Sequence, residues 1–146
     1  HELRRDISRV IRQVRPDRML IQSPDRNWER IQASHPDHLA AGDAAIQAVY
    51  PDARNPFAHT SLLIDEGLEE WTVPEVWLLA SPTPNYWNDI TDNFEAKLAA
   101  LRAHESQTGH MDDLEGRIRG WMTLQAKQAG LAEGRLAEAF MIVSTA

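Results

Sequence analysis

Apolar side chains near the start of the chain recur with the period of an amphipathic helix. They fall every three or four residues, and arginines occupy positions between them. The pattern predicts a helix over residues 3–14 that stops before Pro16. The apolar positions are Leu3, Ile7, Val10, Ile11 and Val14, and the arginines are Arg4, Arg5, Arg9 and Arg12.

A short apolar run at residues 19–21 follows this helix and ends at Ser23-Pro24-Asp25. It is typical of a strand buried on both faces in a parallel sheet. Helix, turn and strand in this order indicate an α/β fold. An irregular polar stretch comes next, and an alanine-rich run predicts a helix over 39–50 that closes at Pro51.

The second half of the chain continues this alternation. Residues 52–74 carry little pattern beyond a short helical spacing at 61–71, and proline-bounded strands are expected at 75–80 and 86–91. A capping-box spacing from Asp92 to Glu95 predicts a helix that runs to about Gln107 and stops at Gly109. A helix from Leu114 and a last strand at 137–143 follow. The chain shows no internal repeat or change of composition, so we expect one domain over 1–146.

Charge and composition exclude some classes of binding partner and of metal ligand. The 146 residues include 15 basic and 22 acidic side chains, which give a net charge of −7. An acidic chain has no general attraction for phosphate backbones, so nucleic acid is not an expected partner. No apolar run is long enough to span a bilayer, and we expect a soluble, cytoplasmic protein. The chain has no cysteine, so any metal must be held by histidine or carboxylate side chains.

The segment His35-Pro36-Asp37-His38 has the residue types of a helix start. Ser34 or His35 can cap the helix, proline is tolerated in a first turn, and an aspartate there favours the positive end of the helix dipole. His35 and His38, three residues apart, then project on one side of that turn. The turn follows a buried strand, at the edge where open α/β sheets keep their sites.

The spacing by itself leaves two interpretations open. Two histidines three apart are also typical of a surface pair or a cap, and a catalytic zinc normally takes three protein ligands where this motif supplies at most two. His59, His104 and His110 are too far apart in the sequence to be assigned. The sequence has no glycine-rich phosphate loop and no Gly-x-Ser-x-Gly elbow.

Four segments, taken in order, resemble the carboxy-terminal part of the LmbE-like family. These are zinc-dependent N-acetylglucosaminyl deacetylases related to the phosphatidylinositol-glycan (PIG-L) deacetylase. The alanine- and arginine-rich composition resembles that of actinobacterial members, some of which act on mycothiol precursors. The segments are Arg15-Pro16-Asp17-Arg18, His35-Pro36-Asp37-His38, the helix around residues 97–107, and Ala137-Glu138-Ala139-Phe140.

The resemblance implies a Rossmann-like α/β fold, with a mostly parallel sheet, flanking helices and a zinc site at its carboxyl edge. It assigns His38 as a metal ligand and His35 as the group that stabilises the oxyanion and protonates the leaving amine. Asp37 would orient or tune that histidine, and His104 and Gln107 would support the site. The substrate would be a small acetylated amino sugar or a related conjugate.

The family's amino-terminal His-Pro-Asp-Asp-Glu motif, which supplies the other ligands and the base, does not occur in this sequence. The chain also begins with His1 rather than methionine. We therefore expect an incomplete, carboxy-terminal portion of the domain, inactive alone, whose remaining zinc ligands lie upstream of residue 1. A missing amino-terminal segment or a second copy would then complete it. The alternative is a non-catalytic binding or assembly module that lacks the metal centre.

Overall fold

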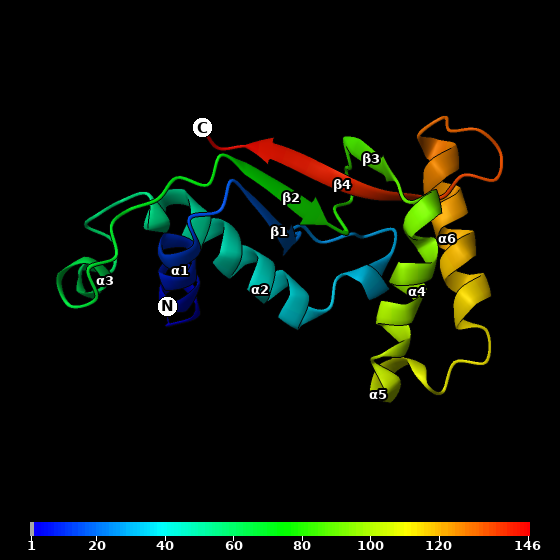
Figure 1. Ribbon diagram of the computed structural model, residues 1–146, viewed down its shortest axis with the longest axis horizontal. Coiled ribbons are helices and arrows are strands. Elements are labelled where there is room, and N and C mark those ends of the chain that lie inside the picture. Colours follow the sequence, from blue (N-terminus) through cyan, green and yellow to red (C-terminus); the bar gives the residue numbers. More distant parts are fainter. Residues whose placement is uncertain (1) are drawn as a thin grey trace. The chain divides into compact units, whose positions relative to one another are not determined.

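The computed structural model describes residues 2–146 (Figure 1). The chain divides into two compact units, and each is described by itself. The first unit comprises the residues up to 85 together with 140–146, and the second comprises residues 86–139.

The first unit is built on a β-α-β arrangement. β1 and β2 are parallel, with Met19 opposite Val76 and Ile21 opposite Leu78. The buried side chains of both strands pack with α1 and α2 in one core. Its elements are α1 (Glu2–Val14), β1 (Arg18–Gln22), the 3-10 turn η1 (Ile31–Ala33), α2 (Pro36–Gln47), the π-type turn η2 (Ala48–Ala53), α3 (Thr60–Ile64) and β2 (Glu75–Leu79).

Helix α1 forms where the spacing predicts it, but the residues that it buries differ from those predicted. Ile7 and Ile11 pack in the core as expected. Other members of the apolar stripe are exposed, with Val10 at 54% and Val14 at 66%. Arg12, on the expected polar side, is buried because it donates hydrogen bonds to four backbone carbonyls between residues 52 and 58. Segment 52–58 therefore covers the polar side of α1.

The sheet is mixed within the described residues. β4 (Ala137–Ser144) runs antiparallel to β2, with Val76 opposite Val143, and the strand order is β1-β2-β4-β3. The α/β fold class with flanking helices is confirmed, and the antiparallel β4 departs from the mostly parallel sheet expected. An apolar run predicts a buried strand but does not encode its direction, because direction depends on the path of the chain between strands.

The second unit contains β3 (Tyr86–Asp89), the 3-10 turn η3 (Thr91–Asn93), α4 (Phe94–Arg102), α5 (Glu105–Thr108) and α6 (Leu114–Gln128). Its core includes Phe94, Leu98 and Met122. The prediction of one helix running to Gln107 is wrong, because the chain breaks between α4 and α5. There the Thr108 hydroxyl bonds the Leu101 and His104 carbonyls, which provides partners for backbone groups at the helix ends.

Two other details of the predicted elements are corrected. Within residues 2–146 the Asp92 capping box does not form, because Asp92 lies inside η3 and Asn93 is the N-cap residue, without a side-chain cap bond. The helix expected at 61–71 ends at Ile64, and Gly67 then adopts a left-handed φ of 67° that allows the chain to turn.

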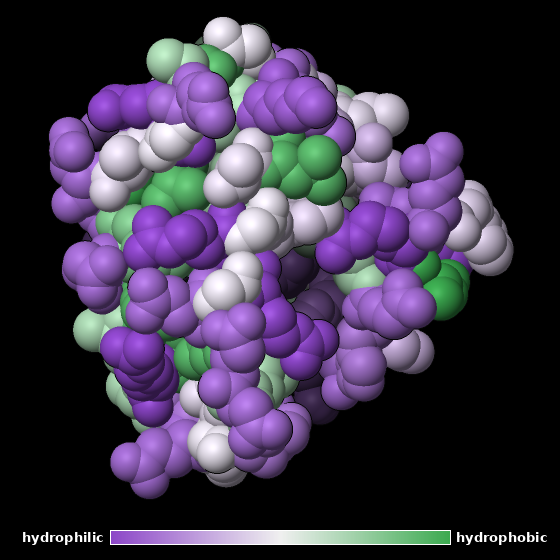
Figure 2. Space-filling model, turned by 90° about the vertical axis from the view of Figure 1, so that its right-hand side faces the viewer, coloured by the Kyte–Doolittle hydropathy of each residue, from purple (hydrophilic) through white to green (hydrophobic). Residues whose placement is uncertain are grey.

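Within residues 2–146, no helix combines the length and the apolar character needed to cross a membrane. Hydrophobic residues on the face drawn in Figure 2 form separate small groups among hydrophilic ones.

Candidate functional site at the start of helix α2

The first turn of α2 is defined by its own sequence. His35 is the N-cap residue with extended backbone angles (φ −58°, ψ 135°), and its side chain accepts a hydrogen bond from the N–H of Asp37. Pro36 occupies the first helical turn, where its missing N–H leaves no hydrogen bond unmade. The predicted helix start at His35-Pro36-Asp37-His38 is confirmed.

The two histidines of this turn are accessible and adjacent. The centres of their rings lie 5.6 Å apart, with a tilt of 51° between the ring planes. The side chain of His35 is 61% exposed, and His38 is also exposed. Both imidazoles can therefore reach a ligand from the solvent side.

The hydrogen bond at His35 indicates which ring nitrogen carries the proton. Nδ1 of His35 lies 3.2 Å from the backbone nitrogen of Asp37 and accepts its hydrogen. In the neutral ring the proton is then on Nε2, which is left as a hydrogen-bond donor. A carboxylate oxygen of Asp37 lies 3.8 Å from the same Nδ1, close enough to pair with the ring when it is protonated.

Helix α2 lies close against the carboxyl end of β1 at a glycine. A Cβ atom on Gly42 would lie 2.4 Å from the carbonyl oxygen of Gln22, so only glycine permits this approach of helix and strand. The His35 turn begins about two helical turns before Gly42, or roughly 10 Å along the axis. Figure 1 shows the start of α2 on the side to which the β1 arrow points.

The donor set of this turn is small. Among residues 2–146, no three or more histidine, aspartate or glutamate side chains come together in a way that could hold a metal ion. Nδ1 of His35 already accepts a backbone hydrogen bond, which leaves His38 as the imidazole suited to a metal. A catalytic zinc normally needs three protein ligands, so the described residues fit part of a zinc site and do not complete one.

The other two candidate residues lie in the second unit. His104 precedes α5, and its carbonyl accepts the N–H of Gln107. Both side chains are exposed. Their assignment as site support stays a prediction.

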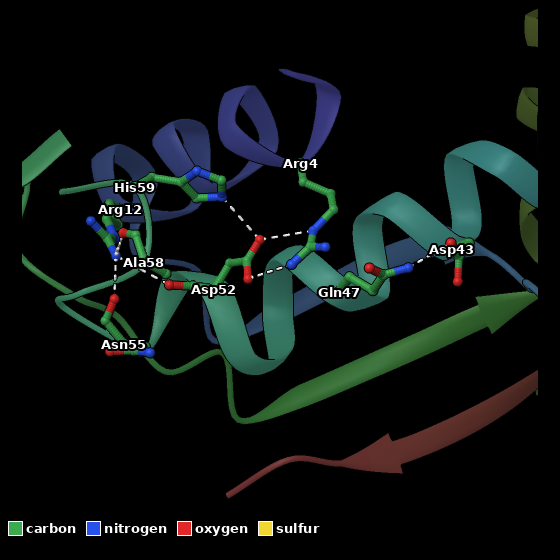
Figure 3. A network of polar contacts seen from close by, with 8 residues as sticks. All are labelled: Arg4, Arg12, Asp43, Gln47, Asp52, Asn55, Ala58 and His59. Carbon is green, nitrogen blue, oxygen red and sulfur yellow. Dashed lines mark hydrogen bonds and ion pairs between the residues drawn. The ribbon is translucent and has the colours of Figure 1, made fainter. Parts of the chain in front are cut away.

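The sequence did not indicate a buried polar network in the first unit (Figure 3). The Asp52 carboxylate accepts two hydrogen bonds from the Arg4 guanidinium, at 2.9 and 2.6 Å, and its Oδ2 lies 3.0 Å from Nε2 of His59. Asp52 and His59 are almost entirely buried. Burial alone would raise the pKa of Asp52, but hydrogen bonds from Arg4 and His59 outweigh it and hold that pKa below its usual value.

Similar proteins were found among curated sequences and solved structures, although no family model matches the chain. The chain is 38% identical over 106 residues to the diacetylchitobiose deacetylase of Thermococcus kodakarensis, covering 73% of this chain and 38% of that protein. It is 31% identical over 116 residues to a probable N-acetyl-alpha-D-glucosaminyl L-malate deacetylase 2 of Bacillus cereus, covering 77% of this chain and 46% of that one.

A solved N,N'-diacetylchitobiose deacetylase from Pyrococcus horikoshii, bound to its inhibitor MPG, has the same fold. It aligns with a TM-score of 0.83 and 31% identity over 98% of this chain and 51% of its own. The chain belongs to the LmbE-like (PIG-L) family. It spans about half the length of these LmbE-like relatives or less.

Likeness of fold extends beyond the deacetylases. A 4-carboxy-2-hydroxymuconate hydratase from Pseudomonas putida KT2440 aligns with a TM-score of 0.69 at 18% identity, and it shows the fold alone. Likeness of fold does not by itself establish a chemistry, so the activity of this chain has to be argued from its site.

Proposed function

We propose that the intact protein removes the acetyl group from an N-acetylated amino sugar or a related small conjugate. The observation that carries the proposal is the exposed His35–His38 pair, built into the first helical turn of a chain related to two sugar deacetylases. The reaction breaks an amide bond: water adds to the carbonyl carbon, acetate forms, and the amine nitrogen leaves with a proton.

His35 would act on the charge that develops during this reaction. Its Nε2–H is free of the cap bond and can donate to the oxygen that becomes negative in the tetrahedral intermediate. When the ring instead gains a proton on Nδ1, the Asp37 carboxylate at 3.8 Å becomes its natural partner. Asp37 would thus orient His35, which would deliver a proton to the leaving amine.

His38 would serve as one ligand of a zinc ion, and the remaining ligands would come from outside residues 2–146. When bound, zinc supplies Lewis acidity toward the amide carbonyl and toward water. The assignment is supported by the exposure of His38 and by the engagement of the neighbouring Nδ1 of His35. His104 and Gln107 remain proposed as supporting residues, and the cytoplasmic location remains a prediction.

We also propose that a segment outside this chain, supplied by the longer fold of the relatives, covers the groove between α1 and β1. The groove has a volume of about 500 Å³ and is lined by apolar residues that include Val10, Val14 and Leu20. The prediction of a strand buried on both faces is not met by β1 as described, because Leu20 is 58% exposed, and a covering segment would bury it. The Pyrococcus horikoshii structure, of which the chain covers 51%, contains further chain of sufficient length. A second copy of this chain is the other occupant, and sedimentation of the intact protein as a dimer joined through this groove would favour it.

The competing function is a binding or assembly module without a metal centre. It is favoured by the incomplete donor set among residues 2–146. Acetate release from N-acetylglucosamine or diacetylchitobiose by the intact protein distinguishes the two. Metal-dependent release supports the hydrolase, and a protein with neither metal nor acetate release is the module.

A further inference from the structure

The loop that leads from β1 to His35 displays a tryptophan to solvent. Trp28 is 80% exposed, and the guanidinium carbon of Arg26 lies 5.5 Å from the centre of its ring. Large aromatic side chains are usually buried at least in part, because burial of their apolar area stabilises the fold. The exposed side chain of Trp28 thus contributes little to the stability of this unit.

The loop around this tryptophan is nevertheless held in one shape by hydrogen bonds. The side-chain oxygen of Asn27 accepts the backbone N–H groups of Glu29 and Arg30, at 3.1 and 2.9 Å. At the start of the loop, the hydroxyl of the buried Ser23 accepts the N–H of Asp25. The backbone on both sides of Trp28 is therefore fixed while the indole stays uncovered.

One further hydrogen bond ties the tryptophan to the candidate site. The N–H of Asn27 donates to the hydroxyl of Ser34 at 2.7 Å, and Ser34 is buried. Trp28 follows one member of this pair and His35 follows the other. Trp28 and His35 are therefore each one residue away from a direct contact between the two ends of this loop.

We propose that Trp28 stacks against the pyranose ring of the acetylated sugar and so determines how tightly the substrate binds. The inference rests on the proposed function, because it takes an amino sugar as the ligand. One face of a pyranose presents C–H groups, which pack on an aromatic ring, while its hydroxyls need polar partners. Exposed charged side chains of the same loop, on Asp25, Arg26 and Glu29, can provide such partners, and that of Arg26 lies beside the indole. Both curated relatives are named for substrates that contain an acetylated amino sugar.

The test uses the intact protein with Trp28→Ala and Trp28→Phe, and Phe57→Ala as a control. Phe57 is 84% exposed and lies outside this loop. Its replacement by alanine therefore also removes an exposed aromatic side chain, but at a distance in the sequence from the candidate site. Acetate release from N-acetylglucosamine and diacetylchitobiose gives KM and kcat. We expect Trp28→Ala to raise KM roughly three- to tenfold with little change in kcat, because stacking acts equally on substrate and transition state. Trp28→Phe keeps most of the affinity, and Phe57→Ala leaves both constants unchanged.

A binding measurement separates this inference from the proposed function. The indole N–H signal of Trp28, assigned by its loss in Trp28→Phe, is followed by NMR during titration with each sugar. A shift of this signal supports stacking even when no acetate is released, in which case only the proposed function fails. Acetate release with an unchanged KM in Trp28→Ala and an unmoved indole signal overturns the inference and leaves the proposed function standing. If no acetate is released and the indole signal does not shift, both the inference and the proposed function are overturned.

Discussion

The backbone N–H of Asp37 donates a hydrogen bond to Nδ1 of His35 across the first turn of α2, at 3.2 Å. The imidazole is thus both the cap of the helix and the candidate donor to an oxyanion. These two roles use different ring nitrogens, so substitutions can separate them.

Replacement of His35 by asparagine should preserve the cap and remove the Nε2–H donor. Asparagine is among the best N-cap residues, so thermal unfolding of His35→Asn should stay close to that of the unsubstituted protein. Its kcat for acetate release should fall by a factor on the order of 100–1000, as for loss of an oxyanion donor. His35→Ala should lose the same activity and also about 1 kcal/mol of stability. Unchanged kcat in both variants would remove His35 from the reaction.

Replacement of His38 by alanine should lower the metal content of the intact protein. His38 is exposed and follows the cap, so its loss should not affect folding. Zinc measured by atomic emission after gel filtration should fall well below that of the parent protein. His110→Ala, which removes an exposed histidine outside the motif, should retain zinc. Equal zinc in the two variants would show that His38 is not a ligand.

Replacement of Gly42 by alanine should destabilise the fold. The added methyl group would lie 2.4 Å from the carbonyl oxygen of Gln22, which is backbone and cannot move aside. We expect a loss of roughly 1–3 kcal/mol in the free energy of unfolding, as for overpacking, measured by urea denaturation. Gly120→Ala is the matched control, since a Cβ added there meets no atom within 4 Å beyond its chain neighbours and its own helix backbone, and alanine should stabilise the helix. Equal effects at both positions would mean that α2 does not approach β1 this closely.

The Asp52 network should make stability depend on pH in the acid range. The folded-state pKa of Asp52 is lowered, so its contribution is complete above its unfolded pKa of about 3.9 and is lost as pH falls through the lower folded value. Asp52→Asn should cost roughly 1–3 kcal/mol near neutral pH and flatten this dependence. Denaturation at a series of pH values measures both effects. The exposed Arg9–Glu66 pair offers a control, and Glu66→Gln should change stability less. A larger effect of Glu66→Gln would contradict this account.

The spacing of apolar residues and the positions of prolines and capping residues predicted several helices and strands of this molecule. The 3.6-residue spacing indicated α1, apolar runs bounded by breakers indicated β1 and β2, and proline beside a capping residue indicated the start of α2. The bidentate contact of Arg4 with Asp52 joins residues 48 apart, and no local pattern contains it. The burial of Arg12 has the same non-local cause, because its partners are carbonyls of a segment without regular pattern. The break between α4 and α5 is accompanied by hydrogen bonds from the Thr108 hydroxyl to the Leu101 and His104 carbonyls, which the helical spacing of the sequence does not indicate.

The candidate site divides in the same way. The helix start at His35-Pro36-Asp37-His38 could be predicted from residue type, whereas the roles of His35 and His38 come from the family resemblance and remain predictions. The contribution of Trp28 could not be predicted, because it depends on the hydrogen bond that Asn27 makes to Ser34 across the loop.

Zinc content and acetate release of the intact protein, measured together before and after chelation, test whether it is a zinc-dependent deacetylase. We expect about one zinc ion per chain, acetate release from N-acetylglucosamine or diacetylchitobiose, loss of that release on chelation and recovery on addition of zinc. We also expect residues 1–146 alone to release no acetate and to hold zinc weakly. An intact protein that releases acetate with no bound metal, or that binds zinc and releases none from any acetylated amino sugar, would contradict this proposal.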